Sequence, residues 1–345
     1  MKKRFEQALN CETTDQVPFL PAIYEHKAWF VGSTPSKVCK DAELLTTALL
    51  AEYESVQPDA LTIGIDVYNV EPEAVGCTVT YYDDNNTSVP AITTQGAAIQ
   101  SFEEIHSLKS PDPHKEGRMP LNLEVAANVM KALGNEVPIR GALSGPFSMA
   151  AHLVGPEHLF LLPFTQPDLL HKLLQFCCDV TKRYGAEFIR LGCGVVLFDS
   201  QASCDLLDPQ IYREFVLPKT RTLIEDFRGL GVRNVPLIIG GNTTKMLTEY
   251  LETGANNILC DFRSDAKEFL AGCSSVGRAF RRNVDSTDFL AISSDEVHRR
   301  TLKYLEESNA YPGFILGTAV LPYGVPLSHM AAMREAIQEF KVHKR

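Results

Sequence analysis

Short apolar runs alternate along the chain with longer segments that place apolar residues at three- and four-residue spacing. Eight runs have the length and β-branched content of buried strands, at residues 17–23, 60–67, 139–143, 194–198, 236–239, 257–260, 277–280 and 314–316. Between them, segments such as 168–174 and 243–251 have the spacing of amphipathic helices. Eight strand–helix alternations favour a closed α/β barrel over an open doubly wound sheet.

The start of the chain lacks a feature that is typical of an open nucleotide-binding sheet. No glycine-rich turn follows the first predicted strand, where Tyr24, Glu25 and His26 stand instead. A TIM barrel accommodates roughly 250 to 400 residues in one domain, and this chain has 345. We therefore predict an α/β fold with a single (β/α)8 TIM-barrel domain over residues 1–345 and an N-terminal extension before its first strand.

Three carboxylates and an amide follow the second predicted strand without an intervening loop. They are Asp66, Asn69, Glu71 and Glu73. The carboxyl ends of the strands form the active-site mouth of a barrel, so these side chains are candidates for catalysis. An acid within an apolar strand must be paired or functional, which singles out Asp66. Glu71 and Glu73 could instead cap the next helix.

Other polar and aromatic residues follow the remaining predicted strands. The candidates at the mouth are Tyr24, His26, Phe147, Asp199, Ser200, Asn242, Asn283 and Asp285. Asp199, Ser200 and Asn242 could equally be helix N-caps, because Asp, Ser and Asn side chains accept hydrogen bonds from free N–H groups. His26 has a structural alternative, and Phe147 has core packing as its alternative.

Composition excludes several classes of partner. The net charge is -10, and Arg278, Arg281 and Arg282 form the one dense basic patch, which argues against nucleic acid. No apolar run approaches the roughly 20 residues of a membrane span, and a polar segment follows Met1–Arg4 where a signal peptide would be apolar. The nine cysteines have no CxxC spacing, as in a reducing compartment. We predict a cytoplasmic protein.

Several motifs occur in an order that identifies a family. After Asp66–Gly76, the motifs are Ser144-Gly145-Pro146-Phe147, Phe198-Asp199-Ser200, Leu207–Phe215, Gly241-Asn242-Thr243-Thr244, Asn283-Val284-Asp285, Leu316-Gly317-Thr318 and Gly324-Val325-Pro326-Leu327. In this order and over almost the whole chain, the sequence resembles the uroporphyrinogen decarboxylase superfamily. That superfamily contains decarboxylases and corrinoid-dependent methyltransferases, all with the barrel fold.

Local residues distinguish the branches of that superfamily. Decarboxylases hold tetrapyrrole carboxylates with an arginine-rich segment after the first strand, but Ile23–Trp29 contains no arginine. Asp66 does align with the aspartate that decarboxylases use. Methyltransferases that activate thiols carry a zinc set of His-x-Cys on the fifth strand and Cys near the eighth. The segments Ile238–Gly240 and Gly317–Ala319 lack those ligands, so zinc is not expected through that set.

The remaining resemblance is to the substrate:corrinoid methyltransferase component of anaerobic O-demethylases. It implies cleavage of a methyl ether, for which we expect an aryl methyl ether, and transfer of the methyl group to the Co(I) of a corrinoid (cobalamin) held by a partner protein. The leaving oxygen then needs an acid or a metal.

Catalytic candidates for this chemistry are Tyr24, His26, Asp66, Glu71 and Glu73, as proton donors or as N/O ligands of a possible zinc ion. Substrate-binding candidates are Asn69, Phe147, Asp199, Ser200, Asn242, Asn283 and Asp285. Two alternatives remain open: a decarboxylase of a small or tetrapyrrole carboxylic acid, and a non-catalytic barrel that binds a corrinoid or tetrapyrrole.

Overall fold

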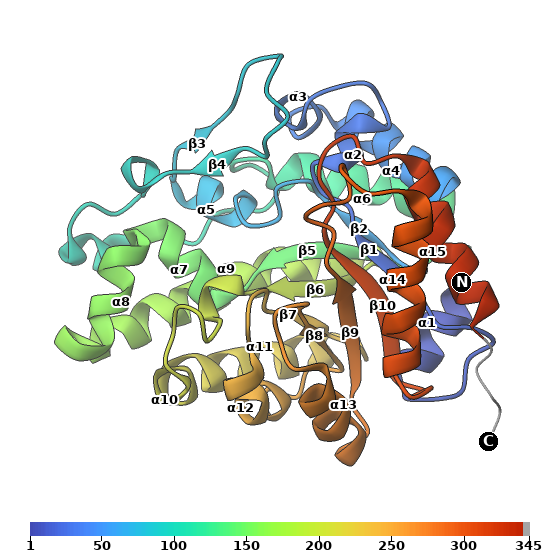
Figure 1. Ribbon diagram of the computed structural model, residues 1–345. Coiled ribbons are helices and arrows are strands. Elements are labelled where there is room, and N and C mark those ends of the chain that lie inside the picture. The colour runs from blue at the N-terminus through green and yellow to red at the C-terminus, as the bar shows by residue number, and fades with distance from the viewer. Residues whose placement is uncertain (341–345) are drawn as a thin grey trace.

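Eight parallel strands form one curled sheet surrounded by helices (Figure 1). A computed structural model describes residues 1–340. The strands are β1 (Phe19–Ala22), β2 (Leu61–Ile63), β5 (Ile139–Ser144), β6 (Gly194–Phe198), β7 (Leu237–Ile238), β8 (Asn257–Cys260), β9 (Ala279–Val284) and β10 (Phe314–Val320). Their order in the sheet is β1-β10-β9-β8-β7-β6-β5-β2. The predicted TIM-barrel fold and all eight predicted strands are confirmed.

Helices cover the outside of this sheet. Their bounds are α1 (Lys2–Leu9), α2 (His26–Trp29), α3 (Pro35–Val38), α4 (Ala42–Val56), α5 (Val70–Val75), α6 (Met119–Leu133), α7 (Pro146–Val154), α8 (Pro156–Thr165), α9 (Pro167–Arg190), α10 (Pro209–Ile211), α11 (Leu217–Gly229), α12 (Leu247–Glu252), α13 (Ala266–Ser275), α14 (Ser294–Glu307) and α15 (Leu327–Glu339). The long helix α9 buries a stripe that includes Leu169, Leu170, Leu173 and Leu174, at the spacing that predicted it. Helix α1 is the extension before β1.

Three strands end four residues away from their predicted ends, and two of these differences change the position of site residues. The strand expected at 60–67 ends at Ile63, because Gly64 adopts a φ of 102° and turns the chain. Asp66 therefore lies beyond β2 and not within it. The strand expected at 277–280 continues to Val284, so Asn283 lies inside β9. The last strand continues beyond Leu316 to Val320.

A small second sheet was not predicted. Strands β3 (Val79–Thr80) and β4 (Ala91–Ile92) pair in antiparallel fashion in the excursion between α5 and α6. This excursion lies above α5 and α7 in Figure 1. We call residues 77–100 the arm. Its residues Val89–Ile92 line the main cavity of the barrel, so the arm covers part of the mouth.

The two edge strands of the curled sheet, β1 and β2, meet through Asp59. Its backbone N–H donates to the carbonyl of Phe19 at 2.8 Å. Its carboxylate accepts from the Phe19 N–H at 2.7 Å and from Arg4 Nη1 at 2.9 Å. Both Asp59 and Phe19 are buried, so the Phe19 N–H has no other partner if this carboxylate is removed. Asp59 therefore joins the edges of the barrel and ties α1 to it.

Replacing Asp59 with alanine should lower the free energy of unfolding by about 1–3 kcal/mol, because the Phe19 N–H and the Arg4 guanidinium lose a buried partner. Urea unfolding at neutral pH measures the change. The control is Asp15→Ala. Asp15 is the other carboxylate that pairs with Arg4, and its own side chain is 67% exposed. That variant should lose less than about 1 kcal/mol. Equal losses would show that closure does not depend on Asp59.

Candidate functional site

The main cavity, of about 930 Å³, opens at the carboxyl ends of the strands. Its lining comes from the segments after β1, β2, β6, β7 and β8, from β9 and β10, and from the arm. Tyr24, Tyr68 and Phe198 give it an aromatic wall, and both tyrosine rings meet Phe198 edge-on at 6.0 Å between centroids. Of the predicted site residues, those that line this cavity are Tyr24, Asp66, Asn69, Ser200 and Asn283.

Asp66 is bound by an arginine that the sequence analysis did not select. Arg118, at the start of α6, holds both carboxylate oxygens of Asp66, at 2.8 and 2.7 Å. Its Nε donates to Glu73 at 2.6 Å. The bidentate geometry is the strong form of such a pair. A buried aspartate signals that a cation must be near, but the sequence does not say which one, because Arg118 is 52 positions away.

The same network reaches the arm. Asn69 Nδ2 donates to Asp66 at 3.2 Å and to the carbonyl of Pro90 at 2.6 Å. The Tyr81 hydroxyl donates to Glu73 at 2.8 Å, and the Arg118 guanidinium lies over the Tyr81 ring at 5.5 Å. Asp66, Asn69 and Glu73 therefore hold the arm against the mouth of the barrel.

Glu71 and Glu73 both lie on helix α5, two positions apart, and contact different partners. Glu71 is fully buried and accepts from the Ser144 N–H at 2.8 Å and from the Ser144 hydroxyl at 3.2 Å. Burial raises the pKa of Glu71 to about 7. Glu71 does not line the cavity. It links α5 to the end of β5.

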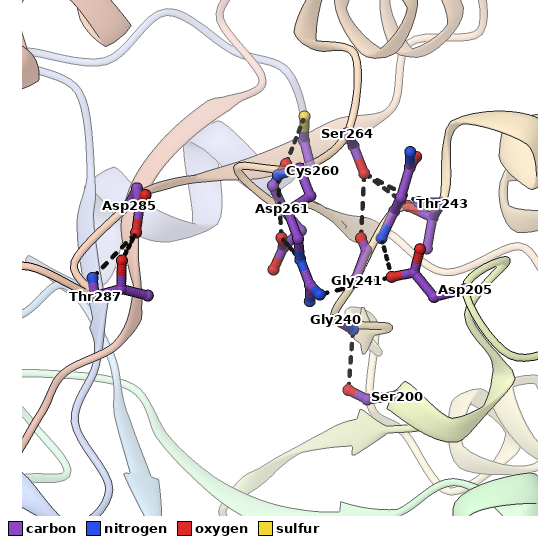
Figure 2. Close-up of polar contacts among 12 residues, drawn as sticks. Ser200, Asp205, Gly240, Gly241, Thr243, Cys260, Asp261, Ser264, Asp285 and Thr287 are labelled. Carbon is purple, nitrogen blue, oxygen red and sulfur yellow. Dashed lines mark hydrogen bonds and ion pairs between the residues drawn. The ribbon is translucent and has the colours of Figure 1, made fainter.

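Ser200 and Tyr68 form a polar contact on the cavity wall. The Tyr68 hydroxyl and Ser200 Oγ are 2.6 Å apart, and the Gly240 N–H donates to Ser200 Oγ at 2.9 Å. Figure 2 shows the contact between Ser200 and Gly240. Because Gly240 follows β7 and Ser200 follows β6, this contact fixes two neighbouring loops of the mouth.

Asp199 faces away from the cavity and caps a helix that precedes it in the chain. Its carboxylate accepts from the Ser148 N–H at 2.6 Å, in the first turn of α7. A Cβ at Gly145 would collide with the Asp199 side chain, so glycine permits this approach. Burial raises the pKa of Asp199 to about 6. The capping alternative thus describes Asp199, although the helix is α7 and not the following one.

Asn242 and Asp285 shape loops at the rim. Asn242 donates its backbone N–H to Asp205 at 2.9 Å, and its Oδ1 accepts from the Thr244 N–H at 3.1 Å; the N-cap of the following short helix is Thr243 and not Asn242. Asp285 accepts from the N–H and the hydroxyl of Thr287 at 3.0 and 2.7 Å (Figure 2). Neither lines the cavity. Each is a local turn contact of the kind that Asn and Asp make with residues two positions later.

His26 and Phe147 lie in packed surroundings. The His26 ring stacks on Trp29 at 5.2 Å and meets Phe30 edge-on at 5.0 Å. Burial lowers the pKa of His26 to about 4, so the ring is neutral at pH 7. Phe147 is fully buried and packs against Phe160 at 5.9 Å. Neither side chain lines the cavity.

The residues proposed as metal ligands do not fit a zinc site. Within residues 1–340, no three His, Cys, Asp or Glu side chains are grouped as metal ligands. Asp66 and Glu73 are paired with Arg118, and Glu71 accepts a hydrogen bond from Ser144. His26 packs against the rings of Trp29 and Phe30. We therefore derive no step through zinc.

The charged residues of the cavity that were not among the predicted catalytic or substrate-binding residues are Glu25, Asp205, Asp261, Arg263 and Arg281. Glu25 lines the cavity after β1 and is partly buried, and among the described residues its carboxyl group forms no ion pair or hydrogen bond with another residue. Burial raises the pKa of Glu25. Arg281 lines the cavity from β9 and is 4% exposed. The predicted strand ended at residue 280, just before Arg281. The alternation of strand residues between two faces was therefore not applied to Arg281, and its inward orientation was not predicted.

A parallel eight-stranded barrel whose mouth holds aromatic walls and convergent polar groups defines a TIM-barrel enzyme. The model of the family described as uroporphyrinogen decarboxylase (URO-D) matches residues 1–340. The chain therefore belongs to the uroporphyrinogen decarboxylase family. In the part that the structure describes, no helix has the length and apolar character needed to cross a membrane.

Relatives within this family carry two kinds of name. The methylcobamide:CoM methyltransferase MtbA of Methanosarcina acetivorans is 28% identical over 77% of both chains. A methylated-thiol–coenzyme M methyltransferase of Methanosarcina mazei is 26% identical over 87% of this chain and 77% of its own. A uroporphyrinogen decarboxylase of Solibacter usitatus is 25% identical over 88% of this chain and 86% of its own. The solved structure of a Methanosarcina mazei methyltransferase shares the fold, with a TM-score of 0.85, 23% identity and 98% coverage of both chains.

The raised pKa of Glu71 predicts a specific pH dependence of stability. Between pH 4.5 and about 7, the unfolded chain releases a proton that folded Glu71 keeps, so this residue makes the protein less stable as pH rises through that range. Glu71→Gln stays neutral and keeps an acceptor for the Ser144 N–H. As pH rises from 4.5, the free energy of unfolding of this variant should therefore increase relative to that of the unmodified protein. The difference should grow by at most about 3 kcal/mol and become constant above pH 7.

Urea unfolding of both proteins at pH 5, 6, 7 and 8 would measure that difference. A difference that stays constant over this range would mean that Glu71 does not keep its proton in the folded protein.

Proposed function

We propose that this protein transfers a methyl group from a methyl ether, specifically an aryl methyl ether, to the Co(I) of a corrinoid carried by a partner protein. The observation that carries the proposal is the unpaired carboxyl group of Glu25 in an aromatic-walled cavity at the mouth of the barrel. Relatives named methylcobamide and methylated-thiol methyltransferases support methyl transfer involving a corrinoid. We propose an ether because an ether oxygen is a poor leaving group unless it is protonated, and Glu25 can supply the proton. A good leaving group would not require a proton donor.

The reaction breaks the bond between the methyl carbon and the oxygen. The methyl group passes to Co(I), and the bonding electron pair stays on the oxygen, which becomes an alkoxide or phenolate unless it is protonated. Glu25 donates that proton. Its burial favours the protonated form, which is the form a general acid requires.

The remaining lining residues position the substrate. Tyr24, Tyr68 and Phe198 offer ring edges and faces to an aromatic group. Ser200 and Asn69 contribute polar contacts at the wall, and Arg118 neutralises the charge of Asp66 beside them. In this proposal Asp66 orients its neighbours and Glu25 is the acid.

The rim of the cavity suits a protein that delivers the corrinoid. Leu206 and Val320 both line the mouth and are 52% and 46% exposed. Exposed large apolar side chains next to a site are typical of an interaction surface. Asp205, Asp261 and Arg263 surround them with charge, as in a polar, transient interface.

Decarboxylation of a small acid is the second candidate function. Arg281 favours it, because a buried guanidinium in the cavity can hold a carboxylate. The two functions differ in their products: one yields methyl-Co(III) and requires a corrinoid, and the other releases CO₂ without it.

The test is incubation of the purified protein with cob(I)alamin and a panel of methoxylated arenes, with methyl-Co(III) followed in the visible spectrum. Glu25→Gln should lower the rate by roughly 100-fold or more, because a general acid contributes on that order. The loss should be larger for donors with poorer leaving groups, since these depend most on protonation. The control is Glu157→Gln, on the exposed surface of α8.

An unchanged rate in Glu25→Gln would remove Glu25 from the mechanism. Donor-independent spectra together with CO₂ release from aromatic acids would replace methyl transfer with decarboxylation.

A further inference from the structure

Neighbouring arginines on β9 have opposite surroundings. Arg282 points outward, where it pairs with Glu307 at 2.6 Å and lies over the Tyr304 ring at 4.0 Å. Arg281 points into the barrel and lines the cavity. Because successive strand residues face opposite sides of a sheet, Arg281 cannot reach the surface charges that satisfy Arg282.

Arg281 is buried without a counter-ion. It is 4% exposed, and no residue from 1 to 340 forms a hydrogen bond or an ion pair with its guanidinium. Its neighbours across the sheet are Leu259 on β8 and Ile315 on β10, which offer no polar side-chain atoms. A buried charge in apolar surroundings is costly unless it is paired. A ligand that carries a negative charge would supply the missing partner.

Three carboxylates of the cavity are held by other arginines, and the fourth, Glu25, forms no ion pair with Arg281. Asp66 is held by Arg118 through two hydrogen bonds. Asp261 lies 3.1 Å from the Nε of Arg263, and Asp205 lies 3.7 Å from the same guanidinium. Figure 2 shows Asp205 and Asp261 engaged at the rim. Among the described residues, no carboxylate of the cavity is therefore paired with Arg281.

Polar groups converge on the same end of the cavity. Asn283 lies two residues further along β9, on the same face of the strand as Arg281, and is 3% exposed; its side-chain NH2 is a hydrogen-bond donor. Tyr24 lines the same cavity as Arg281 and Asn283. The amide and the hydroxyl can both donate hydrogen bonds to an anion beside the guanidinium.

Gly317 on β10 makes room for this group of side chains. A Cβ at that position would lie 2.7 Å from Asn283 Oδ1 and 2.9 Å from Arg281 Cδ. Any larger residue would displace both side chains. The inward position of Arg281 thus depends on a glycine in the adjacent strand.

We infer that the inner end of this cavity is a carboxylate-binding site, in which Arg281 pairs with the acid group of a small aromatic substrate and Asn283 and Tyr24 complete its hydrogen bonds. Arg281 lies three residues before the end of β9, which places it about 10 Å below the mouth. A substituted benzene ring spans that depth and leaves its far substituent near Glu25. If the proposed function holds, the methyl donor is a methoxylated arene carboxylate; anion binding itself does not depend on that function.

Binding of para-methoxybenzoate and of the neutral, nearly isosteric para-methoxybenzamide, measured by calorimetry, tests the site. The unmodified protein should bind the carboxylate at least 10-fold more tightly than the amide. Arg281→Met should lose that preference and keep its affinity for the amide, because methionine fills a similar volume without charge. Arg281→Lys should keep part of the preference, since it keeps the charge but not the two-pronged geometry.

The matched control is Arg282→Met, one residue away and facing outward, which should bind both ligands as the unmodified protein does. Equal affinities of the unmodified protein for the two ligands would overturn the inference without any variant. So would a carboxylate preference that survives in Arg281→Met. Inorganic phosphate is the third probe, and phosphate binding tighter than that of the carboxylate would assign the site to a different anion.

The outcome is separable from that of methyl transfer. Carboxylate binding through Arg281 with no methyl-Co(III) from any methoxylated donor would uphold the site and reject the proposed function. Methyl transfer from neutral ethers, together with no binding preference for the carboxylate, would uphold the proposed function and reject the carboxylate site.

Discussion

The organisation of the mouth depends on one buried guanidinium. Arg118 neutralises Asp66 and Glu73 together, from the first residue before α6. Through Asn69 and Tyr81 the same network holds the arm over the cavity. Removal of this charge would leave two carboxylates near each other without a counter-ion, which costs several kcal/mol for buried groups. The position of the arm, and hence the shape of the cavity, follows from this constraint.

The charged side chains near the mouth form two groups, those that are paired with another residue of the protein and those that are not. Asp66, Glu71 and Asp199 stabilise the scaffold through an arginine, a serine and a helix N-terminus. Glu25 and Arg281 remain without partners in the described chain, and both face the cavity. A polar group that faces a cavity and has no partner within the protein is available to a ligand. This division is the physical basis for placing the acid and the anion site at those two residues.

The pattern of apolar runs predicted the fold well and the strand ends less well. All eight strands were found because buried parallel strands and amphipathic helices have different hydrophobic periods. The end of β2 was missed because Gly64 turns the chain at a positive φ, which apolar periodicity does not report. The end of β9 was missed because Arg281 and Asn283 look like loop residues, although they face the interior of a barrel with a polar cavity.

The sequence by itself determined the barrel, the family and the stretch of chain around the mouth, since these depend on periodicity and on motifs that are local. Only the tertiary structure decided which of the polar residues are paired. Asp66 and Arg118 are 52 positions apart, Glu71 and Ser144 are 73 apart, and Asp199 and Ser148 are 51 apart. A charge is neutralised by whatever lies within a few ångströms, and the barrel brings together residues whose separation in sequence carries no sign of the contact.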